Sequence, residues 1–275
     1  MSLILLGLIQ GLTEFFPISS SGHLVIAKYY LNLYLPGAAF EAFVHFGTVL
    51  AVIALFRKEI KELVMSFFNS IYKLFQGEDL SNILKNDSFS KFAWYLIIST
   101  IPAAIIGYVF SSYLEILFNK TIITSLMLFI TGTLLWFGNK NFTGGNKDIS
   151  KIAYKDAIYI GIAQAIAIIP GISRSGLTVL AGLWRNLDRE FAAKYSFILS
   201  IPIILGATIF KIGELSSLNI NISTLITSGL VALISSYGAM KIFIVLLKSR
   251  KIYFFSYYLW IISTFTICIA LLRRH

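Results

Sequence analysis

Charged residues are scarce in this chain of 275 residues, since Asp, Glu, Lys and Arg together make up only 13% of it. A typical soluble domain carries about 25% charged residues. Hydrophobic residues reach 57%, and the mean hydropathy is +0.80. No soluble core can bury so many apolar side chains. The composition therefore excludes a soluble protein and predicts a single integral membrane domain over residues 1–275.

Cysteine is also nearly absent. Cys268 is the only one in the sequence, so an internal disulfide and a Cys-based metal cluster are both excluded. It lies in an apolar run and is interpreted as a small buried hydrophobe. The net charge of +10 does not indicate a nucleic-acid partner, because the basic residues lie in short loops between apolar runs, as membrane topology requires.

Long apolar segments define the expected fold. A helix needs about 20 residues, at 1.5 Å per residue, to cross a bilayer. Six segments meet this length: 39–56, 92–111, 121–138, 191–210, 223–247 and 252–272. Regions 2–34 and 156–187 are apolar but interrupted by Gly and Pro, which predicts two re-entrant helical hairpins. The amphipathic stretch 57–75 is expected to lie in the interface. We therefore expect an all-α polytopic membrane protein with six transmembrane helices and two re-entrant hairpins.

The distribution of basic residues predicts an orientation. Loops on one side of the expected spans hold fifteen of the 23 Lys and Arg residues, whereas the opposite side holds five. The richer side is expected to be cytoplasmic. We therefore expect a multi-pass protein of the plasma membrane with both termini outside. On the poorer side lie Lys28, Lys120, Lys211, Arg273 and Arg274.

The two interrupted regions resemble each other. The segment "GLIQGLTEFFPISSSG" (7–22) aligns without a gap to "GIAQAIAIIPGISRSG" (161–176), with an offset of 154 and six identities in sixteen positions. Three spans follow each segment, so the halves have opposite orientations in the membrane. We predict an inverted-topology repeat, residues 1–140 and 155–275, in which two broken helices meet near the midplane.

Polar residues cluster at the two bends. The first region carries Gln10, Glu14, Ser19, Ser20, Ser21 and His23, and the second carries Gly171, Ser173, Arg174, Ser175 and Gly176. An arginine at membrane depth is costly unless it is paired or hydrated, which indicates a functional role. Two helix N-termini with serines and an arginine favour a phosphate or diphosphate ligand. The alternative is a purely structural ion pair between Arg174 and Glu14.

The same residues suggest a reaction. Gln10 and Glu14 share one helix face at i, i+4, where their oxygens can hold a divalent cation, Mg²⁺ or Ca²⁺, or orient a histidine. His23 titrates near neutral pH and suits a general base, a general acid or a nucleophile. Ser20 lies one turn from His23, so we expect a hydroxyl–imidazole pair. These groups are typical of a phosphoryl-transfer site.

The motifs "QGLTEFFPISSSGHL" and "PGISRSG" resemble the two signatures of the undecaprenyl-diphosphate phosphatase family of the bacitracin-resistance type, and the likeness extends to "STIPAAIIG" and "SFILSIP". The resemblance implies hydrolysis of the terminal phosphate of a polyprenyl diphosphate. The products are inorganic phosphate and the polyprenyl phosphate that carries envelope polysaccharides, and the activity confers bacitracin resistance.

By this resemblance, Gln10 and Glu14 position a metal or a histidine, Ser20 and His23 are catalytic, and Arg174 grips the diphosphate. The family leaves open whether the serine or the histidine attacks. Many members have Glu at the place of Gln10 and Gln at that of His45. His45 is interpreted as a packing residue, and Glu41 is a further candidate for lining the site.

Two other functions fit the same scaffold. A transporter or flippase of polyprenyl phosphate lipids would also use inverted repeats with broken helices. A structural membrane protein would use the polar cluster to hold its helices together. The pairing of Ser20 with His23 favours an enzyme, because transport requires no nucleophile and base. The expected partners are the lipid substrate and membrane lipids, and a homodimer is left open.

Overall fold

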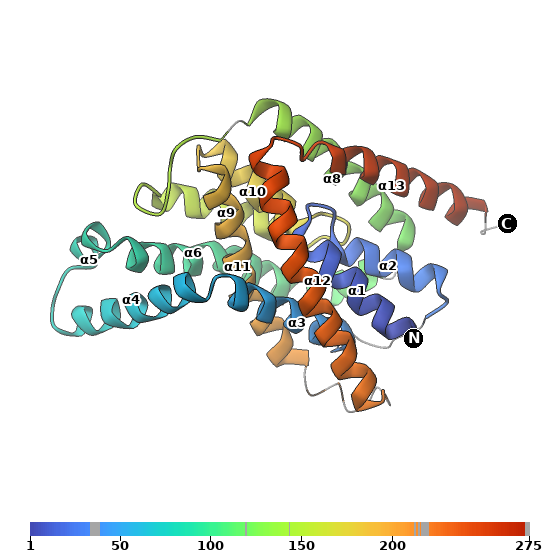
Figure 1. Ribbon diagram of the computed structural model, residues 1–275, viewed down its shortest axis with the longest axis horizontal. Helices are drawn as coiled ribbons and strands as arrows, with labels where there is room; N and C mark the ends of the chain where they lie inside the picture. The colour runs from blue at the N-terminus through green and yellow to red at the C-terminus, as the bar shows by residue number, and fades with distance from the viewer. Residues whose placement is uncertain are drawn as a thin grey trace.

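The computed structural model describes residues 1–33, 39–118, 120–142, 144–211, 213, 215 and 220–272, except for the side chain at position 115. Within these residues all the regular elements are helices, and one isolated bridge joins Lys147 to Leu187 (Figure 1). In chain order they are α1 (Ser2–Phe15), α2 (Ser20–Tyr30), α3 (Ala39–Leu55), α4 (Arg57–Phe75), α5 (Leu80–Asn86), α6 (Ser88–Val109), α7 (Ser111–Phe118), α8 (Thr121–Asn141), α9 (Tyr154–Ile166), α10 (Arg174–Trp184), α11 (Arg189–Lys211), α12 (Ile222–Lys248) and α13 (Phe254–Leu272). The predicted all-α class is confirmed.

Both interrupted regions are pairs of short helices. In the first, α1 ends before Pro17 and α2 begins at Ser20, and in the second, α9 ends before Pro170 and α10 begins at Arg174. Each bend contains one residue with positive φ, Ser19 at 67° and Gly171 at 95°. The predicted breaks therefore lie where proline removes a backbone donor and where the chain reverses.

Five helices of the described chain are long and apolar enough to cross a membrane: α6, α8, α11, α12 and α13. The expected span 39–56 differs. Its helix, α3, has 17 residues and meets the requirement only together with α4, to which it is bent by 90°. The bend coincides with the change from an apolar segment to the charged residues Arg57, Lys58 and Glu59. α4 then packs along α6.

The first helix of each hairpin packs on a helix from the other half of the chain. α1 lies on α12, and α9 lies on α6. A Cβ added to Gly7 would lie 2.4 Å from the carbonyl oxygen of Ser228, and one added to Gly161 would lie 2.9 Å from that of Ser99. These two glycines are equivalent in the repeat, and both permit close helix packing.

The last helices of the two halves, α8 and α13, also lie side by side (Figure 1). Such reciprocal packing is what an inverted repeat would produce. The division of the chain into 1–140 and 155–275 stays a prediction.

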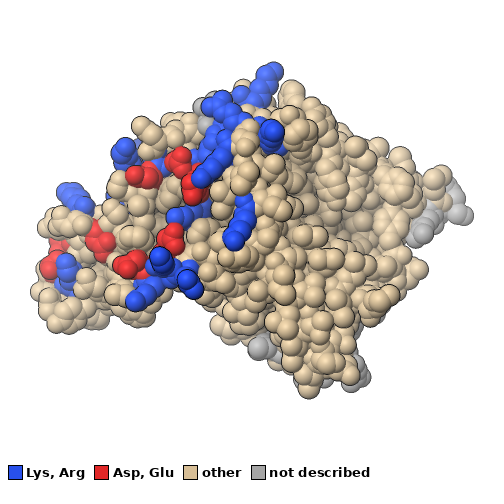
Figure 2. All heavy atoms as spheres, in the orientation of Figure 1, with Lys and Arg blue, Asp and Glu red and all other residues tan. Residues whose placement is uncertain are grey.

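Charged side chains gather toward one end of the molecule, and most of the remaining surface in the same view carries neither charge (Figure 2). Among the charged residues, Asp156 on α9 has a buried carboxylate that accepts hydrogen bonds from Lys147 at 3.2 Å and Arg185 at 2.8 Å. The arrangement suits a membrane protein with one highly charged face. Arg273 and Arg274, which we assigned to the opposite side, lie outside the described residues.

Candidate active site

The second helix of each hairpin begins with the same serine cap. Ser19 Oγ accepts a hydrogen bond from the backbone N–H of Gly22 at 3.2 Å, and Ser173 Oγ accepts one from that of Gly176 at 3.1 Å. In both cases a Ser-x-x-Gly sequence caps the helix by satisfying one of its free N–H groups. The N–H groups of the first two residues of each helix have no acceptor within their own helix.

The remaining tip serines lie beside these caps. Ser21 Oγ is 3.2 Å from Ser19 Oγ, and Ser175 Oγ is 3.3 Å from Ser173 Oγ. The hydroxyl of Ser175 also donates to the carbonyl oxygen of Phe16 at 2.9 Å, which links the second bend to the first. Ser19 and Ser173 therefore act locally as caps, whereas Ser175 connects the two hairpins.

The two bends are in contact. A Cβ added to Gly22 would lie 3.2 Å from Cα of Gly171, and one added to Gly176 would lie 3.2 Å from Cβ of Pro17. These contacts are reciprocal, because Pro17 and Gly171 are equivalent in the repeat. Thr131 Oγ1 on α8 supports the second bend by donating to the carbonyl oxygen of Gly171 at 2.9 Å. The glycines therefore allow the helix starts to approach each other.

The carboxylate of Glu14 joins residues from three helices. Its Oε1 accepts a hydrogen bond from Arg174 Nη2 at 2.7 Å. Its Oε2 accepts hydrogen bonds from Gln10 Nε2 at 2.7 Å and from Ser20 Oγ at 2.5 Å. We call Gln10, Glu14, Ser20 and Arg174 the Glu14 cluster. The four residues come from α1, α2 and α10, and Glu14 is buried, with 4% of its side chain exposed.

Arg174 has donors beyond its bond to Glu14. Its Nη1 donates to the carbonyl oxygen of Ser196 on α11 at 3.2 Å. A guanidinium has five N–H donors, so these two bonds leave further donors for a ligand. The side chain is 15% exposed. The Arg174–Glu14 ion pair considered from the sequence is present, and it leaves the arginine able to bind an anion.

His23 does not pair with Ser20, so that expectation is wrong. The hydroxyl of Ser20 donates to Glu14, whereas His23 Nδ1 lies 2.8 Å from the carbonyl oxygen of Ser19. His23 Nε2 lies 2.7 Å from the hydroxyl of Tyr258 on α13. The reason is geometric, because the cap places the Ser19 carbonyl oxygen one helical turn before the imidazole. Tyr258 was missed, since no motif surrounds it.

A second histidine reaches the Glu14 cluster. His45 Nε2 on α3 is 3.4 Å from Glu14 Oε2, and its Nδ1 donates to the carbonyl oxygen of Glu41 at 2.7 Å. Both ring nitrogens of His45 thus face hydrogen-bond acceptors. The carboxylate of Glu41, the further candidate for lining the site, accepts a hydrogen bond from Lys28 at 2.6 Å.

The described residues contain no group of three or more His, Cys, Asp or Glu side chains arranged to hold a metal ion. One oxygen nevertheless suits a cation. Gln10 Oε1 is buried and lacks a hydrogen-bond partner, and it belongs to the residue whose amide nitrogen binds Glu14. Mg²⁺ is commonly held by one or two protein oxygens together with substrate phosphates and water. The residues fit a cation that arrives with a phosphate ligand.

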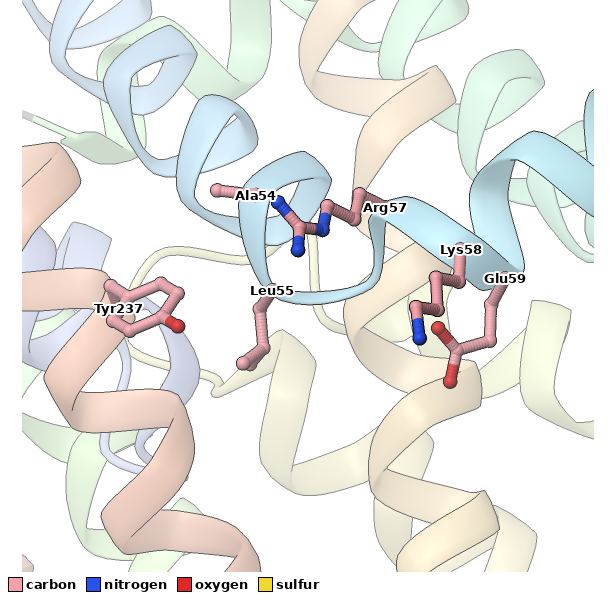
Figure 3. A pocket seen from close by; sticks show the side chains of 6 residues that line it. All are labelled: Ala54, Leu55, Arg57, Lys58, Glu59 and Tyr237. Carbon is pink, nitrogen blue, oxygen red and sulfur yellow. The ribbon is translucent and has the colours of Figure 1, made fainter.

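A cavity of about 350 Å³ lies at the bend between α3 and α4, lined by Ala54, Leu55, Arg57, Lys58, Glu59 and Tyr237 (Figure 3). None of these residues belongs to the Glu14 cluster. Ala54 follows His45 on α3 by nine residues, which corresponds to about 14 Å along the helix. The cavity is therefore separate from the candidate active site.

Comparison with known proteins gives consistent results over nearly the whole chain. The family model described as bacitracin resistance protein BacA matches residues 3–265. The undecaprenyl-diphosphatase of Methanobrevibacter smithii is 40% identical over 262 residues, which cover 94% of each chain. That of Thermosipho africanus is 43% identical over 263 residues, covering 96% of this chain and 97% of the relative. That of Desulforapulum autotrophicum is 38% identical over 265 residues, covering 96% of both.

Proposed function

This chain belongs to the bacitracin resistance protein BacA family, and we propose on that basis that it is an undecaprenyl-diphosphatase. It removes the terminal phosphate of undecaprenyl diphosphate and releases undecaprenyl phosphate and inorganic phosphate. This recycles the lipid carrier for envelope polysaccharide synthesis and underlies bacitracin resistance. The relatives carry the name of a phosphatase, which favours an enzyme over a flippase.

One observation carries the proposed mechanism: the carboxylate of Glu14 joins the hydroxyl of Ser20 to the guanidinium of Arg174. A nucleophile and a phosphate-binding group from opposite halves of the chain are thereby held around one side chain. The uncapped N–H groups at the starts of α2 and α10 supply further donors for phosphate oxygens. Such converging donors suit a diphosphate better than a carboxylate.

The hydrogen bond between Ser20 and Glu14 supports Ser20 as the nucleophile. Ser20 Oγ attacks the terminal phosphorus, the bond from that phosphorus to the bridging oxygen breaks, and the lipid leaves as its monophosphate. The hydroxyl proton passes to Glu14, which lies 2.5 Å away. Water then hydrolyses the phosphoserine, with His23 on the same helix as the acid–base group.

Other parts of the site bind and orient. Arg174 and the tip residues around Ser173 and Ser175 hold the diphosphate, and Gln10 fixes the carboxylate of Glu14. A divalent cation, when bound, neutralises negative charge on the diphosphate. Gln10 Oε1 and Glu14 are its expected protein ligands. All these residues belong to one chain, so the proposal needs no second copy.

The chain is a multi-pass membrane protein, and we place it in the plasma membrane with both termini outside. The charge asymmetry of its loops supports this orientation. The substrate's isoprenoid tail then lies among the apolar helices, with the diphosphate at the bends of the two hairpins. The relatives' activity favours a site that opens to the outer face.

Phosphate release by the purified protein in detergent tests the proposal directly. The parent is expected to release inorganic phosphate from undecaprenyl diphosphate, whereas a pure flippase would release none. Ser20→Ala should lower kcat by at least about a thousandfold. Ser263→Ala is a matched control, because that buried hydroxyl donates only to Trp260 in its own helix. A parent without activity, or an active Ser20→Ala protein, would contradict the proposal.

A further inference from the structure

The contact between His23 and Tyr258 joins the first hairpin to the last helix of the chain. The hydroxyl of Tyr258 lies 2.7 Å from His23 Nε2, across 235 positions of sequence. The two rings are nearly parallel, with an angle of 8° and a centroid distance of 5.6 Å. Neither the signature motifs nor the aligned segments 7–22 and 161–176 include Tyr258.

The geometry fixes the tautomer of the neutral imidazole. His23 Nδ1 faces the carbonyl oxygen of Ser19 at 2.8 Å. A carbonyl oxygen only accepts hydrogen bonds, so Nδ1 carries the proton and the lone pair lies on Nε2. The hydroxyl of Tyr258 must then donate to Nε2. This nitrogen is the atom through which the neutral ring can accept a proton.

The position of Tyr258 is determined by packing between the last helices of the two halves. The next residue, Leu259, is fully buried, and a Cβ on Gly132 of α8 would lie 3.1 Å from it. Trp260 Nε1 donates to Thr133 Oγ1, also on α8, at 3.1 Å. α8 in turn contacts both α2 and α10. Tyr258 is therefore held on a pair of packed helices, α8 and α13, of which α8 contacts the second helix of each hairpin.

Exposure differs sharply between the two rings. His23 is 7% exposed, whereas Tyr258 is 41% exposed. The Nε2 atom of the buried imidazole thus contacts the hydroxyl of a more exposed residue. On the basis of the proposed function, we propose that Tyr258 is a positioning residue for His23. Its hydroxyl donates to Nε2, holds the imidazole in the Nδ1–H tautomer and in one orientation, and acts on catalysis only through that ring.

Replacement of Tyr258 by phenylalanine removes one hydroxyl and retains the ring. We expect Tyr258→Phe to lower kcat for phosphate release about tenfold, the size of one lost side-chain hydrogen bond. KM should change by less than about twofold, because Arg174 and the helix starts bind the diphosphate. Tyr257→Phe is the matched control. Tyr257 is 47% exposed, and no hydrogen bond of its hydroxyl is found within the described chain.

A double-mutant cycle separates positioning from a general effect on folding. In a His23→Gln background, assayed at high enzyme concentration, Tyr258→Phe should cause no further loss, because its partner is already gone. The same tenfold loss in that background would overturn the proposal, as would an unchanged kcat in the single variant. A parent that releases no phosphate would instead contradict the proposed function.

¹⁵N NMR of histidine-labelled protein gives a readout that needs no turnover. The chain has three histidines, so the His23 signal can be assigned by comparison with His23→Gln. In the parent above the imidazole titration, Nδ1 should be protonated and Nε2 should show a hydrogen-bonded lone pair. Tyr258→Phe should shift the Nε2 signal, whereas Tyr257→Phe should not. A neutral parent ring protonated at Nε2 would overturn the inference.

Discussion

The substitution Arg174→Lys tests whether the reaction requires the planar guanidinium of Arg174 or only its positive charge. The guanidinium uses two terminal nitrogens at once, Nη2 for Glu14 at 2.7 Å and Nη1 for Ser196 O at 3.2 Å. A lysine retains the positive charge near Glu14, but its single ammonium cannot reproduce the planar fork and still bind a phosphate. The substitution therefore tests whether the planar guanidinium is required, while a lysine ammonium still pairs with the buried carboxylate of Glu14.

The expected magnitude follows from the lost hydrogen bond. One hydrogen bond involving a charged group contributes about 1.5–3 kcal/mol. If the lost bond is made to the transferring phosphate, kcat/KM should fall roughly 10- to 150-fold. The thermal midpoint should change little, because the ion pair keeps both charges. Arg174→Ala is a poorer test, since it would leave a buried carboxylate without its arginine and cost about 3–5 kcal/mol.

The assay is phosphate release from undecaprenyl diphosphate in detergent, with thermal unfolding of the same preparations. Arg185→Lys is the control, because Arg185 also pairs with a buried carboxylate, Asp156, at 2.8 Å but lies outside the Glu14 cluster. It should keep kcat/KM within about twofold of the parent. An Arg174→Lys protein with more than half of the parental kcat/KM would refute the reasoning, and so would equal losses in the two variants.

Four further outcomes are expected. Gly11→Ala should lower stability by about 1–3 kcal/mol in thermal unfolding, because its Cβ would lie 2.4 Å from Ala232 O. Gly238→Ala on α12 is the control and should not lower stability, because an added Cβ there faces open space. Equal thermal midpoints for the Gly11→Ala and Gly238→Ala proteins would contradict this expectation. Asp156→Asn should lower the midpoint by the equivalent of about 1–3 kcal/mol, since Lys147 and Arg185 lose their charged acceptor, while the folded protein keeps its specific activity. Phosphate release should fall as the pH is lowered and His23 becomes protonated, and a flat profile would count against His23 as the acid–base group. A chelator should abolish turnover and Mg²⁺ or Ca²⁺ should restore it, whereas full activity in the chelator would exclude a cation requirement.

Much of the fold follows from local features of the chain. Five of the six expected spans overlap helices that have the length and composition of a membrane helix, because a long apolar run indicates an apolar environment. The sixth, at 39–56, meets these limits only when α3 and α4 are counted as one bent span, because hydropathy measures the composition of α3 but not the direction in which the chain continues after Leu55.

The Glu14 cluster was partly predictable for a similar reason. Gln10 and Glu14 are four residues apart on one helix, so their contact is fixed by helix geometry. The meeting of Glu14 with Arg174 required the repeat, since only its offset of 154 indicated that the two bends face each other. The partner of Ser20 was assigned wrongly because spacing along α2 gives proximity to His23 but not the direction of the hydroxyl.

The sequence by itself determined the helical class and the two broken hairpins, since each depends on residues within a few turns of one another. Only the tertiary structure decided which side chains complete the site. His45 reaches Glu14 because α3 packs beside α1, and Tyr258 reaches His23 because α13 packs on α8. Such contacts depend on the relative placement of whole helices. That placement is determined by the packing of many residues, so no local sequence motif marks either of the two contacting residues.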